Sequence, residues 1–143
     1  MRSLVRITAE PIQVEQVLKS VGNNSAGGTV LFLGTVRNRS DGRRVNGLTY
    51  EVYREMAEMR MREIEADAKR RWPVVRLAMV HRYGNLKVGE VSVAVAVSCE
   101  HRAEAFEAAR FAIDAIKRSL PLWKKEKFVG GKEAWVKGSL ITD

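Results

Sequence analysis

The chain has little of the chemistry that builds disulfides and metal clusters. It contains one cysteine, Cys99, and two histidines, His81 and His101, which lie twenty positions apart. A single cysteine excludes an intramolecular disulfide and a cysteine-based cluster, and the histidine spacing matches no zinc motif. We therefore expect neither a bound metal nor a resident cofactor.

Long hydrophobic runs are also missing. The N-terminal segment carries Arg6 and Glu10 where a signal peptide needs its apolar stretch. The longest uncharged stretch includes residues 21–36 and is interrupted by glycine, asparagine and serine, whereas a membrane span needs about 20 mostly apolar residues. These absences predict a cytoplasmic protein that is not attached to a membrane.

Proline and glycine are too few for a collagen-like or low-complexity chain, at 3 and 11 of 143 residues. The chain is 45% hydrophobic and 29% charged, which is typical of a globular protein long enough to bury one core. Acidic residues are fewer than basic residues, at 17 against 25, which gives a net charge of +8. This balance favours an anionic partner: nucleic acid, a membrane surface, a phosphorylated small molecule or an acidic protein.

Hydrophobic periodicity and turn signals predict the order of the elements. Runs rich in β-branched residues predict strands at 4–8, 29–36, 45–53, 74–83 and 91–99, and a hairpin around Gly130-Gly131. Helical patterns predict helices at 11–22, 54–72 and 100–120, and Asp41-Gly42 and Gly84-Asn85 are turn signals. The order predicts one α+β domain over residues 1–143, with a mostly antiparallel sheet and two long helices.

The last long helix carries cations at its apolar stripe, with Arg102 in the stripe and Lys117 at its margin. Either these cations extend past the core to solvent or to a carboxylate, or they line an anion pocket. His101 and Arg102 fall in the first turn, where free backbone N–H groups favour anions. Fifteen residues separate Arg102 from Lys117, about 22 Å along a helix. A site that uses both is therefore expected to form across a homodimer.

Two further segments are candidates for chemistry. Lys117 lies near the Lys124-Lys125 pair, and a lysine in apolar, basic surroundings can act as a nucleophile or as a general acid or base. Arg37 follows an apolar strand and opens the arginine-rich segment RNRSDGRR, a position at which functional residues gather. An ordinary basic surface and a solvated charged loop are the alternatives for these two segments.

Other conspicuous residues have structural interpretations. Cys99 falls on the same face of its strand as the alternating valines, because it lies an even number of residues from each of them. This position predicts a buried structural thiol. His81 lies within a strand and is expected to be a core or edge histidine. Met56, Met59 and Met61 are expected to fill the core beneath their helix.

An ordered set of segments runs along most of the chain, from about residue 28 to residue 136. The segments are FLGTVRNRSDG, VNGLTYEVY, RWP, HRYGNLKVGEVSVAVAVSCEHRAEAFEA, AIKRSLPLWKKE and a final W-V. This set resembles the large, catalytic subunit of molybdopterin synthase, the MoaE family. The combination of H-R-x-x-A-F-E-A with K-R-x-x-P-x-W-K is its most specific part.

The resemblance implies an α/β hammerhead fold with an added antiparallel sheet, and a sulfurtransferase of molybdenum cofactor biosynthesis. The family converts cyclic pyranopterin monophosphate, an anionic pterin phosphate, to molybdopterin by building a dithiolene. Sulfur arrives as a thiocarboxylate on the C-terminal Gly-Gly of a small ubiquitin-like (MoaD-like) subunit. The resemblance further implies a homodimer within a heterotetramer.

The resemblance also implies roles for particular residues. Lys117 and Lys124 match the family's active-site lysines, Arg37 matches a pocket arginine, and Phe32 matches a pocket-lining aromatic.

Three more positions bear on the resemblance. His101 and Arg102 match the pair that binds the anionic end of the substrate from across the dimer. Lys137 stands near the place of a family arginine that follows the final W-V, and is a candidate replacement for it.

Two alternatives remain at this stage. A small basic α+β nucleic-acid-binding module would account for the net charge and the arginine-rich segment, but no RRM or KH signature is present. The basic residues also do not interleave with exposed aromatics, as single-strand binders require. A scaffold that has lost catalysis is the other alternative, and the presence of both Lys117 and Lys124 argues against it.

Overall fold

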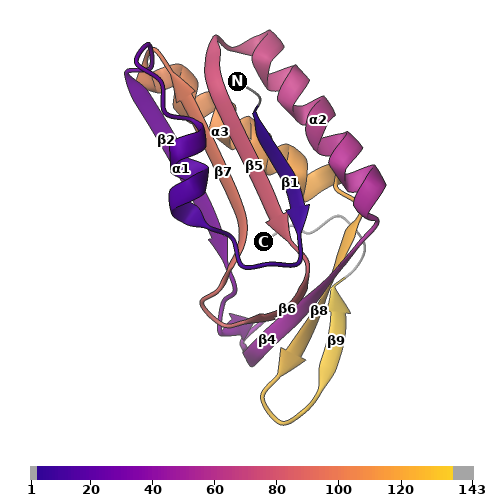
Figure 1. The fold of residues 1–143 in the computed structure, drawn as a ribbon. Helices are drawn as coiled ribbons and strands as arrows, with labels where there is room; N and C mark the ends of the chain where they lie inside the picture. The colour runs from indigo at the N-terminus through magenta and orange to yellow at the C-terminus, as the bar shows by residue number, and fades with distance from the viewer. Residues whose placement is uncertain (1–2, 137–143) are drawn as a thin grey trace.

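A four-stranded sheet forms the centre of the fold (Figure 1). The computed structural model describes residues 3–136, and the strand order in this sheet is β1 (Leu4–Thr8), β5 (Val74–Arg82), β7 (Val91–Cys99) and β2 (Gly28–Thr35). The β1–β5 pair is parallel, whereas β5–β7 and β7–β2 are antiparallel. Nearly every residue of β7 is buried because helices cover both faces of the sheet.

The side chains of β7 explain how helices pack on the two faces. Val93, Val95, Val97 and Cys99 point into the core beneath α2 (Arg54–Arg71) and α3 (Arg102–Ser119). The small side chains of Ala94 and Ala96 point the other way, against α1 (Val14–Ser20). Figure 1 shows α1 in front of the sheet and α3 behind it.

A second sheet extends from the lower end of the first (Figure 1). Its strands run in the order β3 (Arg39–Ser40), β4 (Arg43–Val52), β8 (Leu122–Phe128) and β9 (Glu133–Val136), and β6 (Gly84–Lys87) also pairs with β4. All these pairs are antiparallel. The α+β class with mostly antiparallel pairing and two long helices is confirmed, and the antiparallel strands are divided between two sheets.

Two short strands were not anticipated from the sequence. Gly84-Asn85 was predicted to be a turn, but Gly84, at φ 96°, instead starts β6 immediately after β5. Leu86 is the only large apolar residue in β6, too little to show strand alternation. The Asp41-Gly42 turn is confirmed, with φ of 50° and 75°, and it joins β3 to β4 as a two-residue hairpin.

The methionine prediction is wrong for two of three residues. Met61 is buried, but Met56 and Met59 are 61% and 66% exposed. The buried stripe of α2 consists of Ala57, Met61, Ile64 and Ala68, which recur every three to four residues. Met56 and Met59 both lie outside that stripe and therefore face outward.

Other structural predictions are confirmed. Cys99 is fully buried, and its burial raises the pKa of the thiol. His81 is buried in β5. Arg102, in contrast, is exposed at the first residue of α3, because the buried stripe of this helix begins one turn later at Ala105.

No helix within residues 3–136 has both the length and the apolar character that crossing a bilayer requires. The same part of the chain holds no cluster of three or more His, Cys, Asp or Glu side chains arranged to bind a metal ion.

Candidate active site

A pocket of about 230 Å³ lies where the two sheets meet. Its walls come from the end of β2 and the following loop, the inner faces of β4 and β8, and the last turns of α3. The chain thus brings together segments from its first, middle and last thirds at one cavity.

The floor of the pocket is set by the register of two antiparallel strands. Tyr50 of β4 lies opposite Lys124 of β8, and Leu48 lies opposite Glu126. All four side chains line the pocket, because residues two apart on a strand share a face. Lys124 and Glu126 are each only 8% exposed.

Two buried charges on one strand face require polar partners. The Ser40 hydroxyl of β3 donates a 2.8 Å hydrogen bond to Oε1 of Glu126. The short β3–β4 hairpin therefore supplies a polar partner to the floor of the pocket.

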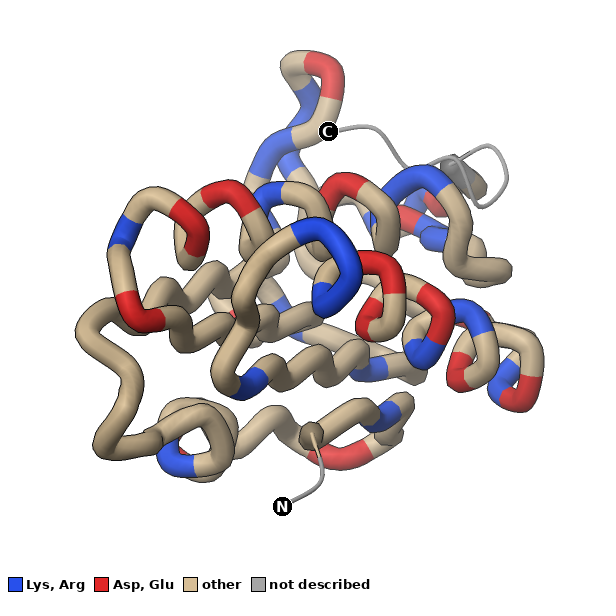
Figure 2. Tube along the Cα trace, turned by 90° about the horizontal axis from the view of Figure 1, so that it is seen from above, with Lys and Arg blue, Asp and Glu red and all other residues tan. Residues whose placement is uncertain are grey.

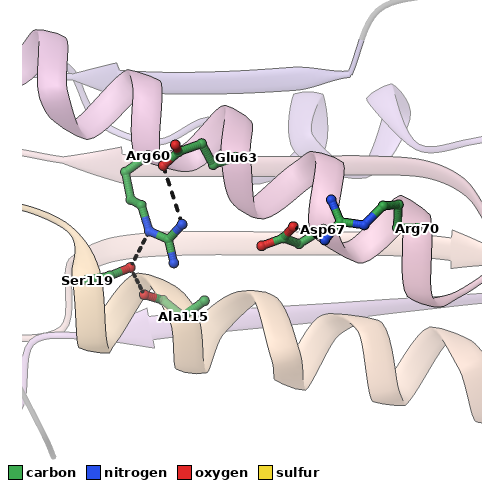
Figure 3. Close-up of polar contacts among 6 residues, drawn as sticks. All are labelled: Arg60, Glu63, Asp67, Arg70, Ala115 and Ser119. Carbon is green, nitrogen blue, oxygen red and sulfur yellow. Dashed lines mark hydrogen bonds and ion pairs between the residues drawn. The ribbon is translucent and has the colours of Figure 1, made fainter.

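Lys117 reaches the pocket from the C-terminal end of α3, where the helix dipole favours a cation. This end is tied to α2 through Ser119, whose hydroxyl donates a 2.6 Å bond to the Ala115 carbonyl (Figure 3). Arg60 Nε donates a 2.7 Å bond to the same Ser119 hydroxyl oxygen. The last turn that carries Lys117 is therefore fixed by a polar contact between helices.

The end of β2 supplies the remaining wall. Gly34 is required because a Cβ there would lie 2.6 Å from Cγ1 of Val93. The register of β2 against β7 shifts between Gly34 and Thr35, and such an irregularity re-aims the chain that follows. Arg37 and Arg39 follow this point and line the pocket, and Phe32, 38% exposed, lies at its edge.

The structure brings four of the six predicted site residues together: Phe32, Arg37, Lys117 and Lys124. It does not bring His101 and Arg102 to this pocket. They lie at the opposite end of α3, both exposed, and His101 Nε2 is 3.3 Å from a Glu100 carboxylate oxygen. The fifteen residues between Arg102 and Lys117 span about 22 Å of helix. Lys137 lies outside the described residues.

Sequence reasoning missed other pocket residues, among them Arg39, Tyr50 and Glu126. The sequence could have indicated Glu126, because it lies two residues after Lys124 and therefore shares its face if the segment forms a strand. Arg39 belongs to the arginine-rich segment, but nothing in the sequence separates it from Arg43, which stacks on the Phe128 ring at 3.9 Å. For Tyr50, the alternation of Leu48, Tyr50 and Val52 in the sequence indicates one face of a strand, but not what that face lines.

The charge of the pocket favours anions. Among the described residues, four cationic side chains line it, Arg37, Arg39, Lys117 and Lys124, together with one carboxylate, Glu126. Arginine binds phosphate and carboxylate groups through paired donors, and a lysine can act as a nucleophile or proton donor. The arrangement suits a phosphorylated or carboxylate-bearing ligand.

Charges elsewhere are mixed in sign. Figure 2 shows basic and acidic segments alternating along the helical turns. On α2, ion pairs join residues three or four apart, including Arg54 with Glu58 and Lys69 with Glu65. The excess positive charge of the chain is therefore not gathered on the outer surface of that helix.

The outer face of β8 and β9 differs from what the sequence indicated. Lys125 lies opposite Trp135 in register, with Nζ 5.1 Å from the centre of its ring. Trp123 lies two residues along β8 on the same face and packs edge-on against Tyr53. A lysine does interleave with aromatic rings here, contrary to the sequence argument, because strand pairing brings together residues that are distant in the chain.

Comparison with known proteins identifies the family. The family model described as MoaE protein matches residues 7–119. The molybdopterin synthase catalytic subunit of Halalkalibacterium halodurans is 43% identical over 136 residues, which is 95% of this chain and 86% of that protein. This chain belongs to the MoaE family.

Solved MoaE-family structures share the fold. Molybdopterin synthase from Staphylococcus aureus superposes with a TM-score of 0.87 at 37% identity, covering 95% of this chain and 98% of that chain. A complex of subunits 1 and 2 of molybdopterin-converting factor from Helicobacter pylori contains a chain with a TM-score of 0.76 at 22% identity, covering 93% and 90%. The resemblance inferred from the sequence motifs is confirmed.

Proposed function

We propose that this chain is the catalytic subunit of a molybdopterin synthase, and that it transfers sulfur from a thiocarboxylated carrier to cyclic pyranopterin monophosphate. The observation that carries the proposal is the convergence of Arg37, Lys117 and Lys124 on one pocket from a loop, a helix and a strand. Family membership supplies the reaction class. The substrate phosphate and the carrier's thiocarboxylate are both anions, which the cationic pocket suits.

The chemistry of each pocket side chain suits a different role in the proposed reaction. Arg37 and Arg39 are proposed to bind an anionic group through guanidinium donors. Lys117 acts as a general acid or base, or forms a transient adduct with the substrate. Lys124 stabilises charge that develops during sulfur transfer, an effect that is strong in a site partly closed to water.

The proposed assembly has two kinds of partner. One is a small MoaD-like subunit with a C-terminal Gly-Gly thiocarboxylate, supported by the two-subunit complex from Helicobacter pylori. The other is a second copy of this chain. The exposed position of His101 and Arg102, at the far end of α3 from Lys117, supports a site that takes these two residues from the partner protomer.

Reconstitution tests the proposal. The purified chain is mixed with a thiocarboxylated carrier and cyclic pyranopterin monophosphate, and the dithiolene product is measured. The wild type should form product, Lys117→Ala should form none while keeping its oligomeric state, and Lys19→Ala, a change at an exposed lysine of α1, should match the wild type. No product from the wild type, with a carrier and substrate that are competent with another synthase, would refute the proposal.

A second candidate function, single-stranded nucleic-acid binding, is favoured by the Trp123, Lys125 and Trp135 arrangement on the outer sheet face. Bases stack on such rings while lysines contact phosphates. Titration of a short RNA, followed by tryptophan fluorescence, tests it. Binding that weakens steeply with salt and is lost in Trp135→Ala supports this function, and weak binding that does not change with salt excludes it.

A further inference from the structure

A small cavity of about 10 Å³, close to the size of one water molecule, lies beside the pocket. It is lined by Tyr50, His81, Ile116, Lys117 and Leu122. Tyr50 and Lys117 line both this cavity and the main pocket. His81 is therefore a titratable side chain that shares a wall with Lys117 and that the proposed reaction does not use.

The His81 ring is held in one orientation. Nδ1 lies 2.8 Å from the Arg82 carbonyl oxygen. A carbonyl oxygen can only accept, so Nδ1 carries the proton, and Nε2 of the neutral ring carries a lone pair. The ring also packs edge-on against Tyr50, with centroids 5.0 Å apart. Arg82 is itself fixed, because its Nη1 donates to Glu90 Oε2 at 3.3 Å.

The charge state of His81 matters to its neighbour. Burial lowers the pKa of His81 to about 4, the hydrogen bond to the Arg82 carbonyl opposes this shift, and the positive charge of Lys117 adds to it. At neutral pH the ring is therefore uncharged. A lysine ammonium is only a donor, so it is compatible with a neutral imidazole and repelled by an imidazolium.

We propose that His81 is a positioning residue for Lys117. In this proposal the neutral ring, which lines the same cavity as Lys117, holds the ammonium through the Nε2 lone pair and packs against Tyr50. This inference rests on the proposed function for its catalytic consequence, but the placement of Lys117 is testable without turnover. A histidine with only a packing role would affect stability and leave the chemistry of Lys117 unchanged.

Three substitutions separate these roles. His81→Phe keeps the ring against Tyr50 and loses both nitrogens. His81→Asn keeps a donor near the Nδ1 position for the Arg82 carbonyl and loses the Nε2 acceptor. His81→Gln places a polar amide near the Nε2 position. The Asn and Gln variants are similar in polarity, so they provide the comparison if the Phe variant does not fold.

The measurement is competitive acetylation with trace acetic anhydride, followed by peptide mass spectrometry on the folded, full-length chain. We expect Lys117 to be acetylated roughly tenfold faster in His81→Phe and His81→Asn, because a side chain that is no longer held by the Nε2 acceptor reaches the reagent more readily. Lys124, in the same pocket, should keep its wild-type rate, and His81→Gln should remain within about twofold of wild type. Unchanged Lys117 labelling in the Asn variant, or an equal change at Lys124, would overturn the proposal.

The reconstituted reaction gives the second readout. His81→Phe and His81→Asn should each lose roughly tenfold in kcat with little change in KM. Both changes misplace Lys117 and leave the anion-binding arginines in place. If the wild type forms no product, the proposed function fails, and the labelling result still decides the role of His81.

Discussion

Ser40 and Glu126 are joined by a 2.8 Å hydrogen bond, although they lie 86 positions apart in the chain. The bond connects the two-residue strand β3 to the floor of the pocket on β8. In the part of the lining that the structure describes, it also fixes the one carboxylate that lies among four cationic side chains. The local fold around the pocket and its charge balance thus depend on the same side chain.

Glu126→Ala is expected to lower the free energy of unfolding by about 2 kcal/mol, because the Ser40 hydroxyl loses its acceptor and the pocket cations lose their counter-charge. Glu126→Gln should cost less, since an amide oxygen still accepts from Ser40. Urea denaturation measures both. Glu133→Ala is the control, because its ion pair with Lys125 is partly exposed and should contribute less than about 1 kcal/mol. Equal costs for the Ala variants at 126 and 133 would contradict this account.

The buried imidazole of His81 predicts loss of stability in acid. Its folded pKa of about 4 lies below the ordinary value of 6.5, so between these values the unfolded chain binds a proton that the native state does not. Stability contributed by the neutral ring is complete above pH 6.5 and is lost as pH falls toward 4, by about 3 kcal/mol in total. Urea midpoints across this range should become less pH-dependent in His81→Gln. An unchanged pH dependence in His81→Gln would contradict this prediction.

Most of the fold followed from local patterns, and most of the site did not. The alternation of Val93, Val95 and Val97 is sufficient to place β7, and Pro121 marks the end of α3. Strand β6 was not predicted, because it has one large apolar residue and therefore shows no alternation. Its formation depends on pairing with β4. Pairing is a property of the folded chain, so no local pattern reports it.

The same limit applies to the pocket. Motif resemblance identified Arg37, Lys117 and Lys124, but Arg39 and Glu126 become pocket residues only through the β3–β4 hairpin and the β4–β8 register. The outward orientation of Met56 and Met59 was also decided by packing, since composition alone did not distinguish them from Met61.

The link between α2 and α3 gives a third prediction. Arg60→Ala and Ser119→Ala should each cost about 1 kcal/mol, because each removes the 2.7 Å bond between the helices. A double-mutant cycle should return a coupling energy of about 1 kcal/mol, since the two residues share that contact. Arg62→Ala, at an exposed position on the same helix, is the matched control and should be within about 0.5 kcal/mol of wild type. Strict additivity of the two changes would show that the contact does not stabilise the fold.

The last prediction concerns an active site that takes Lys117 from one protomer of a homodimer and Arg102 from the other. Arg102 and Lys117 lie about 22 Å apart on one α3 helix, so we expect Arg102→Ala and Lys117→Ala to be inactive alone and to complement each other when mixed. A hybrid dimer has one site with both changes and one site with neither. Random exchange makes half of the dimers hybrids, so activity should recover to about a quarter of wild type. Mixing without subunit exchange is the control. If activity stays absent after exchange is verified by mass spectrometry, Arg102 and Lys117 do not meet across the dimer.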